Sequence, residues 1–226
     1  MPNITERLNV PDVTEVARDA IAAILRDELD NQLTLAINDG DPADEWTIDV
    51  YTERSNSWDQ WVEIRAGNQA PFLNIMLGDL KYDRQRSTVK PEALEVDYKI
   101  DVYTFGLTQD VSGGGHIPGD RTAAFQGARW QAIVRAILLS GQYTYLGSPR
   151  GASQWCFGRW IADSQPFVPQ IENRSAIHGV ATRISLETRL RQPTPQGSGE
   201  PIEELSVQIK RAGDGKILVD ADIVQP

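Results

Sequence analysis

The 226-residue sequence is poor in the residues from which catalytic and metal centres are built. It contains one cysteine, Cys156, and two histidines. One cysteine excludes an internal disulfide framework and a multi-cysteine zinc site, and it fits a reducing compartment. Two histidines do not make the common three-ligand zinc site unless carboxylates complete it. Because Cys156 lies between two aromatic residues, we interpret it as a small buried hydrophobic residue.

The sequence also lacks a long apolar run and an excess of basic charge. No apolar stretch reaches about 18 residues, and residues 1–10 lack a signal-peptide core, so we expect a protein made in the cytoplasm with no membrane partner. The formal net charge is −10, the pI is near 4.7, and the 22 basic residues are scattered. Since phosphate binding needs clustered Lys and Arg, this argues against a protein whose main task is to grip nucleic acid.

What the sequence contains is sufficient for one globular domain with an appendage, because 40% of the residues are hydrophobic and 24% are charged. We predict a core domain over residues 1–192, a linker rich in proline and glycine over 193–203, and a C-terminal β-hairpin over 204–226. The hairpin's alternating apolar face is a candidate partner-binding surface. Its residues are Leu205, Val207, Ile209, Ile217, Val219, Ala221 and Ile223.

Two amphipathic helices are predicted in the core domain. Asp12 can cap the first, and apolar residues spaced by three and four then predict a helix over about residues 13–30. The second helix is predicted over about residues 120–140, with Trp130 buried against a sheet. Small residues would let this helix lie close to the sheet, namely Ala123, Ala124, Gly127 and Ala128.

Alternating segments predict an antiparallel or mixed sheet with both helices packed on one side, an α+β fold. The longest strands are predicted at residues 95–105 and 178–190. In the first, one face meets the core, whereas the face that carries Asp97, Lys99 and Asp101 meets water or another subunit. Shorter strands are predicted at 46–51, 61–64 and 72–77. Residues 141–174 are predicted to be irregular, with aromatic side chains that pack under a long loop or form a partner surface.

A glycine-rich loop, SGGGHIPGDR, precedes the second helix. It is not a phosphate cradle, because a Walker-type loop needs a lysine where Asp120 follows Gly119, and an aspartate repels an anion there. The pattern gives His116 neither a nucleophile nor a metal partner. We therefore predict no catalytic, cofactor-binding or metal-binding residues. We interpret Gly113, Gly114, Gly115 and His116 as a mobile interaction loop.

Three segments carry a resemblance to a known family: residues 93–106 (ALEVDYKIDVYTFG), 120–139 (DRTAAFQGARWQAIVRAILL) and 176–190 (AIHGVATRISLETRL). Together with the N-terminal helix, their order resembles that of the tail-terminator and neck proteins of long-tailed bacteriophages. The resemblance covers about residues 10–192. The sequence departs from the family's pattern in residues 141–174 and after residue 193.

The resemblance implies a structural virion protein of the phage neck and not an enzyme. Tail terminators form a hexameric ring that caps the tail tube, stops its polymerisation and binds the head-tail connector. The expected partners are further copies of the chain, a tail tube or sheath protein and the connector, with DNA only as passing cargo and no cofactor. The alternatives are another phage tail, baseplate or head-completion protein, and a small-molecule binding or enzymatic domain.

Overall fold

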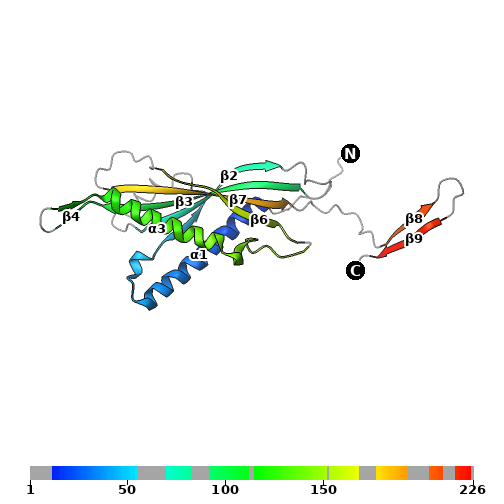
Figure 1. Ribbon diagram of the computed structural model, residues 1–226, viewed down its shortest axis with the longest axis horizontal. Coiled ribbons are helices and arrows are strands. Elements are labelled where there is room, and N and C mark those ends of the chain that lie inside the picture. The colour runs from blue at the N-terminus through cyan, green and yellow to red at the C-terminus, as the bar shows by residue number, and fades with distance from the viewer. Residues whose placement is uncertain are drawn as a thin grey trace. The chain divides into compact units, whose positions relative to one another are not determined.

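The chain divides into two compact units, Val10–Thr194 and a second unit made of Met1–Asn9 with Pro195–Pro226. Among its described residues the first unit holds two α-helices and a five-stranded mixed sheet, so the predicted α+β class is confirmed. The second contains a two-stranded hairpin (Figure 1). This computed structural model describes residues 12–54, 70–82, 92–111, 115–151, 153–167, 177–192, 204–210 and 217–224.

The main sheet has the strand order β1-β2-β3-β7-β6. β1 runs parallel to β2, and every other neighbouring pair is antiparallel. β3 and β7 pair without a break from Glu92 opposite Gln192 to Leu107 opposite Ile177, so they form the centre of the sheet. The strands are β1 (Asp49–Thr52), β2 (Phe72–Tyr82), β3 (Glu92–Leu107), β7 (Ile177–Gln192) and β6 (Cys156–Phe167).

Helix α1 (Val13–Asp39) begins where the sequence predicts and ends later. The Asp12 carboxylate accepts a hydrogen bond from the Thr14 N–H at 2.9 Å. The predicted end near residue 30 is wrong, because the helix continues to Asp39 although Ala36 is its one buried residue after Leu29, and it stops at Gly40, which has a φ of 92°. A left-handed glycine is a common helix stop. The last turns of α1 therefore extend beyond the apolar core against which its first turns pack.

Helix α3 (Gly119–Leu139) packs across β3 and β7 at close range. A Cβ atom on Gly106 would lie 1.9 Å from the Gly119 carbonyl oxygen, and one on Gly127 would lie 3.1 Å from Thr104 Oγ1. Trp130 is buried, as predicted. Of the four small residues expected to face the sheet, Ala123 and Gly127 do so, and the other two, Ala124 and Ala128, are exposed.

Both helices contribute to one apolar core on the same face of the sheet. On β3 this core takes Val96, Tyr98, Ile100 and Val102, which alternate along the strand. The Tyr98 hydroxyl donates a hydrogen bond to the Thr14 carbonyl oxygen at 2.7 Å, which fixes the start of α1 over the strand. The remaining members from the helices are Val13, Ala17, Ile21, Ala22, Leu25, Leu29, Trp130, Val134, Ile137 and Leu138.

Two sequence predictions about the sheet need correction. Residues 141–174 are not irregular throughout, since β6 forms an edge strand along β7, after the short 3-10 helix η2 (Gly141–Tyr143). Register shifts near Gly158 and Ala162 break the alternation by which a strand is recognised. Likewise the strand expected at residues 46–51 begins only at Asp49, after the 3-10 helix η1 (Ala43–Glu45). The strand expected at 61–64 lies outside the described residues.

Candidate assembly surfaces

Part of the glycine-rich loop belongs to a small hairpin between β3 and α3. β4 (Gln109–Val111) pairs antiparallel with β5 (Gly115–Ile117), so that Gly115 stands opposite Val111 and His116 opposite Asp110. Gly113 and Gly114 lie outside the described residues. In Figure 1 the hairpin extends from the end of β3. Its backbone position suits contact with another molecule, and its role as an interaction loop stays a prediction.

The C-terminal hairpin consists of β8 (Glu204–Lys210) and β9 (Ile217–Val224). Their register places Leu205 opposite Ile223, Val207 opposite Ala221 and Ile209 opposite Val219. Residues that stand opposite each other in an antiparallel pair share a face, so this register joins the predicted apolar residues of both strands. The register shifts after Ile209, and Ile217 stands opposite Lys210. A two-stranded hairpin is marginally stable in water alone, so its apolar face needs a partner.

The face of the main sheet that the helices leave uncovered contains a buried ion pair. Asp101 is fully buried, and Arg183 on the neighbouring strand donates to its two carboxylate oxygens at 2.7 and 2.8 Å. The hydrogen bond to Asp101 raises the pKa of the Arg183 guanidinium. The expectation that this face meets water or a subunit is therefore wrong at Asp101, because a directly opposed arginine neutralises the carboxylate inside the protein.

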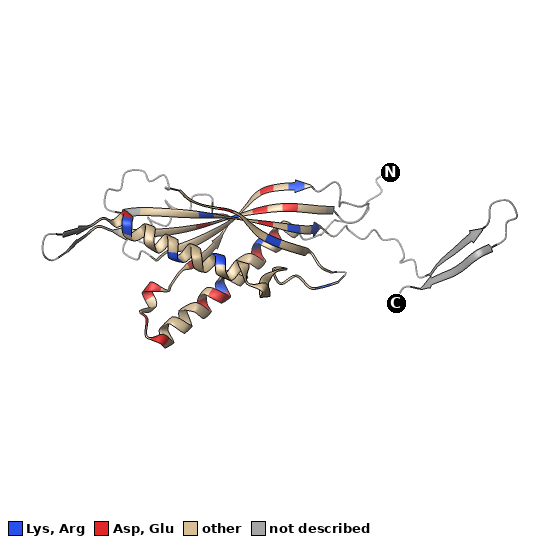
Figure 2. Ribbon diagram, viewed as in Figure 1, with Lys and Arg blue, Asp and Glu red and all other residues tan. Residues whose placement is uncertain are grey.

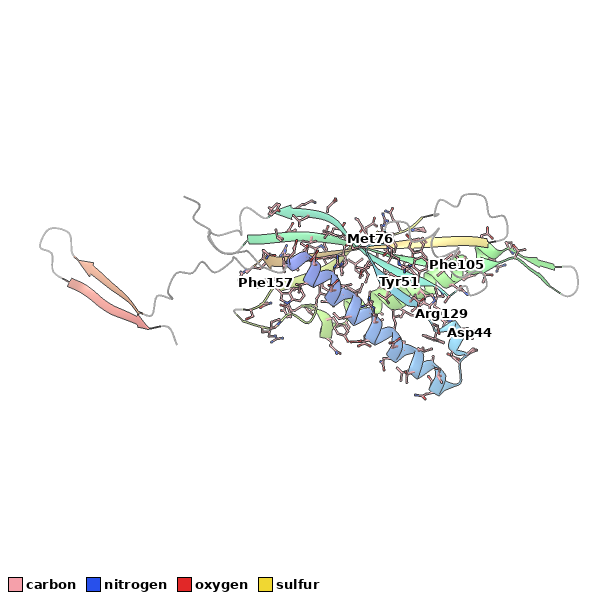
Figure 3. The ribbon with its side chains drawn as sticks, turned by 180° about the vertical axis from the view of Figure 1, so that it is seen from behind. Asp44, Tyr51, Met76, Phe105, Arg129 and Phe157 are labelled. Carbon is pink, nitrogen blue, oxygen red and sulfur yellow. The ribbon has the colours of Figure 1, made fainter. Side chains whose placement is uncertain are left out.

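Aromatic rings continue the same face of the sheet beside the ion pair. Phe72 stacks on Tyr103 with ring centroids 4.5 Å apart, and Tyr51 meets Phe72 edge to face at 5.9 Å. Both Phe72 and Phe105 are buried. The guanidinium carbon of Arg54 lies 3.7 Å from the centre of the Tyr51 ring. Figure 3 shows Tyr51 and Phe105 among these side chains. These contacts serve packing, since aromatic pairs stabilise cores in this way.

The side chains of Cys156 and Tyr98, which could act in catalysis, lie in apolar surroundings. Cys156 is buried as predicted, and burial raises the pKa of its thiol, so the thiolate that would act as a nucleophile is disfavoured. Burial likewise raises the pKa of the Tyr98 hydroxyl. Within the described ranges, no group of three or more His, Cys, Asp or Glu side chains is placed to hold a metal ion. Among the same residues, no helix is long and apolar enough to cross a membrane.

A pocket of about 200 Å³ lies where β3, β6 and β7 meet at one end of the sheet. Its lining includes Phe157, on whose ring the Arg191 guanidinium stacks at 4.5 Å. Ligand pockets usually have volumes of about 300–1,000 Å³. The pocket is therefore small for a substrate site. Both arginines in its lining already contact aromatic rings, since Arg189 lies 5.1 Å from the centre of the Trp160 ring and Arg191 stacks on Phe157.

Sequence reasoning missed two exposed helix surfaces. On α3, Phe125 is 66% exposed and Leu139 is 52% exposed. On the last turns of α1, Leu35 is 49% exposed and Ile37 is 50% exposed. Large apolar side chains at such exposure are common one at a time. Phe125 and Leu139 lie about four turns apart on one side of α3, and exposed apolar side chains that share a helix face are candidates for a contact surface. The spacing of apolar residues in each helix predicts which face packs on the sheet, but it does not predict what the outer face contacts.

No protein-family model matches the sequence, and a search of curated proteins finds no match either. The fold and the exposed surfaces are therefore the basis on which a function is assigned.

Proposed function

We propose that the chain is a structural virion protein of the neck of a long-tailed bacteriophage, a tail terminator. In this role it forms a hexameric ring, caps the tail tube and joins it to the head-tail connector. One observation carries the proposal: the three segments that resemble the family form a single packed unit, with α3 lying across the paired strands β3 and β7.

The contacts inside this unit support a rigid subunit from which a ring can be built. Thr104 Oγ1 on β3 donates to the Ala123 carbonyl oxygen on α3 at 2.7 Å. Gly106 and Gly119 bring the two backbones into direct contact. Packing of this kind holds the outer face of α3 in a fixed position on the sheet, as a surface that docks repeatedly must be.

The remaining features are compatible with a conduit for DNA. The net charge of −10 disfavours tight binding of phosphate, so DNA would pass as cargo. The C-terminal hairpin, with its apolar face, would bind the sheet edge of a tail tube or sheath protein or of a neighbouring copy, because strand addition satisfies unpaired backbone groups.

The first test is native mass spectrometry of the full chain. We expect a closed assembly with a mass six times the 25.1 kDa of one chain. Electron microscopy of the same sample should show rings with a central opening. A chain that stays monomeric at micromolar to millimolar concentration, or that binds a small metabolite in a defined pocket, would overturn the proposal in favour of a ligand-binding domain.

A second test removes residues 194–226 and measures binding to purified tail tubes of the phage that encodes the chain. We expect the shortened chain to keep a cooperative unfolding transition, because residues 10–194 form their own compact unit. Sedimentation with tail tubes should weaken. Undiminished binding would show that the hairpin plays no part in docking, and loss of folding would place it in the core.

A further inference from the structure

Acidic and basic residues are segregated along this chain to a degree that its overall composition hides. Residues 27–45 contain seven Asp and Glu and no Lys or Arg. Residues 121–162 contain five arginines and no Asp or Glu. The basic residues are thus not evenly scattered, as the sequence analysis assumed. The two segments correspond to the second half of α1 with η1, and to α3 with the chain that follows it.

The acidic segment stands out from the body of its own subunit. After Leu29, Ala36 is the one buried residue of α1. Leu35 and Ile37 on either side of it are half exposed. Figures 1 and 3 both show the end of α1 projecting past the sheet. We call residues 30–45 the acidic tip.

The basic segment presents one continuous face of α3. Ala124, Ala128, Ala132 and Ala136 recur every four residues and are all exposed, so they form a low strip along the helix. Small side chains let a second helix approach closely. Phe125 and Leu139 flank the strip with apolar surface. The exposed arginines of this arginine face are Arg121, Arg129 and Arg135.

Several charges on the two surfaces have no ion-pair partner among the described residues of the same subunit. Arg129 lies 3.8 Å from Glu45 of the same chain and stacks on Trp46, which accounts for one arginine. Among the described residues, neither Arg121 nor Arg135 forms an ion pair, and the same holds for the tip acids Asp30 and Asp39. Figure 2 shows acidic residues at the end of α1 and arginines along α3.

We propose that the acidic tip of one copy docks on the arginine face of α3 in the next copy. Each surface offers exposed apolar side chains and unpaired charge of opposite sign, which is the complementarity that orients an interface. Because the two surfaces are different, they can pair head to tail, with the tip of each copy on the α3 face of the next, as the proposed ring requires. Head-to-tail contacts close into rings or continue as filaments. The inference deepens the proposed function and rests on it for closure into a ring.

Charge reversal on each surface tests the contact. The first variant carries Arg121→Glu and Arg135→Glu, the second carries Asp30→Lys and Asp39→Lys, and a third combines all four substitutions. All four side chains are exposed, so folding should be retained, which thermal unfolding monitors. In sedimentation velocity, each of the first two variants should associate at least about tenfold more weakly than the original chain, because like charges then face each other.

Restoration of the complementary pattern is the decisive readout. The four-fold variant exchanges the sign of the charge at residues 30 and 39 of the tip and at residues 121 and 135 of α3, so opposite charges face each other again at these positions and it should assemble. An equimolar mixture of the first two variants should also assemble, with the two kinds of chain alternating. A control with the same change in charge as the first variant, Lys81→Glu with Arg150→Glu, lies outside the acidic tip and outside the arginine face of α3, and it should assemble as the original chain does.

The outcomes separate this inference from the proposed function. If the original chain forms rings and the two-fold variants form them equally well, the docking inference is wrong and the terminator proposal stands. If the original chain forms filaments that both two-fold variants abolish and the combination restores, the contact is right and ring closure is wrong. Failure of the original chain to associate overturns both. Failure of the four-fold variant and the mixture to recover overturns the proposed pairing.

Discussion

The two faces of the main sheet are buried in different ways. On the helix-covered face, β3 contributes Val96, Ile100 and Val102 to the core, and none of its residues on this side carries a charge. On the opposite face, the same strand contributes the carboxylate of Asp101, which is equally buried and held by Arg183. Apolar burial depends mainly on area and volume, whereas a buried charge depends on one partner at one position. The second face is therefore the more sensitive to single substitutions that conserve volume.

The largest effect is expected on the helix-covered face, from Trp130→Ala. Trp130 is 2% exposed and meets Trp46 edge to face at 6.3 Å between ring centroids. Loss of so large a side chain should lower the free energy of unfolding by about 3–5 kcal/mol. Urea denaturation followed by circular dichroism measures the loss. Trp130→Phe keeps most of the apolar area and should lower the free energy of unfolding clearly less. Equal losses for both variants would contradict the view that the volume of the buried side chain determines the stability of this face.

A loss of about 3 kcal/mol is expected on the opposite face from Arg183→Met, because the Asp101 carboxylate would remain buried without its cation. The same urea titration measures it. The control is the double variant Arg183→Met with Asp101→Leu, which removes both charges. A buried pair replaced by apolar residues is often neutral, so the double variant should recover most of the loss. A double variant as unstable as the single one would mean that packing, and not charge, dominates this face.

The different nature of the two faces also explains how far the sequence predicts the fold. Alternation at residues 95–105 and the spacing around Trp130 predict β3, α3 and the helix-covered face, because periodicity reports which side is apolar. The ion pair is not predictable in this way, since Asp101 and Arg183 are 82 residues apart in sequence and meet only through the register of β3 and β7. Edge strand β6 is missed because its register shifts interrupt the period.

Of the surfaces proposed for assembly, the sequence predicts the C-terminal hairpin but not the acidic tip. The alternation after residue 204 predicts the C-terminal hairpin, because a pattern of period two is local. The acidic tip is not predicted as part of a helix, because the apolar spacing in α1 is regular only as far as Leu29. The helix then continues to its cap at Gly40. Charge segregation between residues 27–45 and 121–162 is visible in the sequence. Whether these charges can serve docking depends on how exposed their side chains are, and exposure is known only from the structure.

A smaller effect is expected where α3 meets β3, from Gly106→Ala. The added methyl group would overlap the Gly119 carbonyl, so the helix must shift, and overpacking of this kind costs about 1–3 kcal/mol. Gly141→Ala is the matched control, since a Cβ there meets nothing within 4 Å. Thermal unfolding of the two variants should separate them. A stable Gly106→Ala chain would show that α3 is not seated tightly on the sheet.

The smallest effect is expected from Arg189→Met, on the same strand and the same face as Arg183. Arg189 stands directly opposite Glu95, as Arg183 stands opposite Asp101, but its pair is 3.6 Å apart with both side chains more than 40% exposed. Water solvates both charges, so the loss should stay below about 1 kcal/mol. Added salt screens exposed pairs far more than buried ones. In about 1 M NaCl the cost of Arg189→Met should therefore vanish while that of Arg183→Met persists, and equal salt sensitivity would mean that Asp101 is reached by solvent.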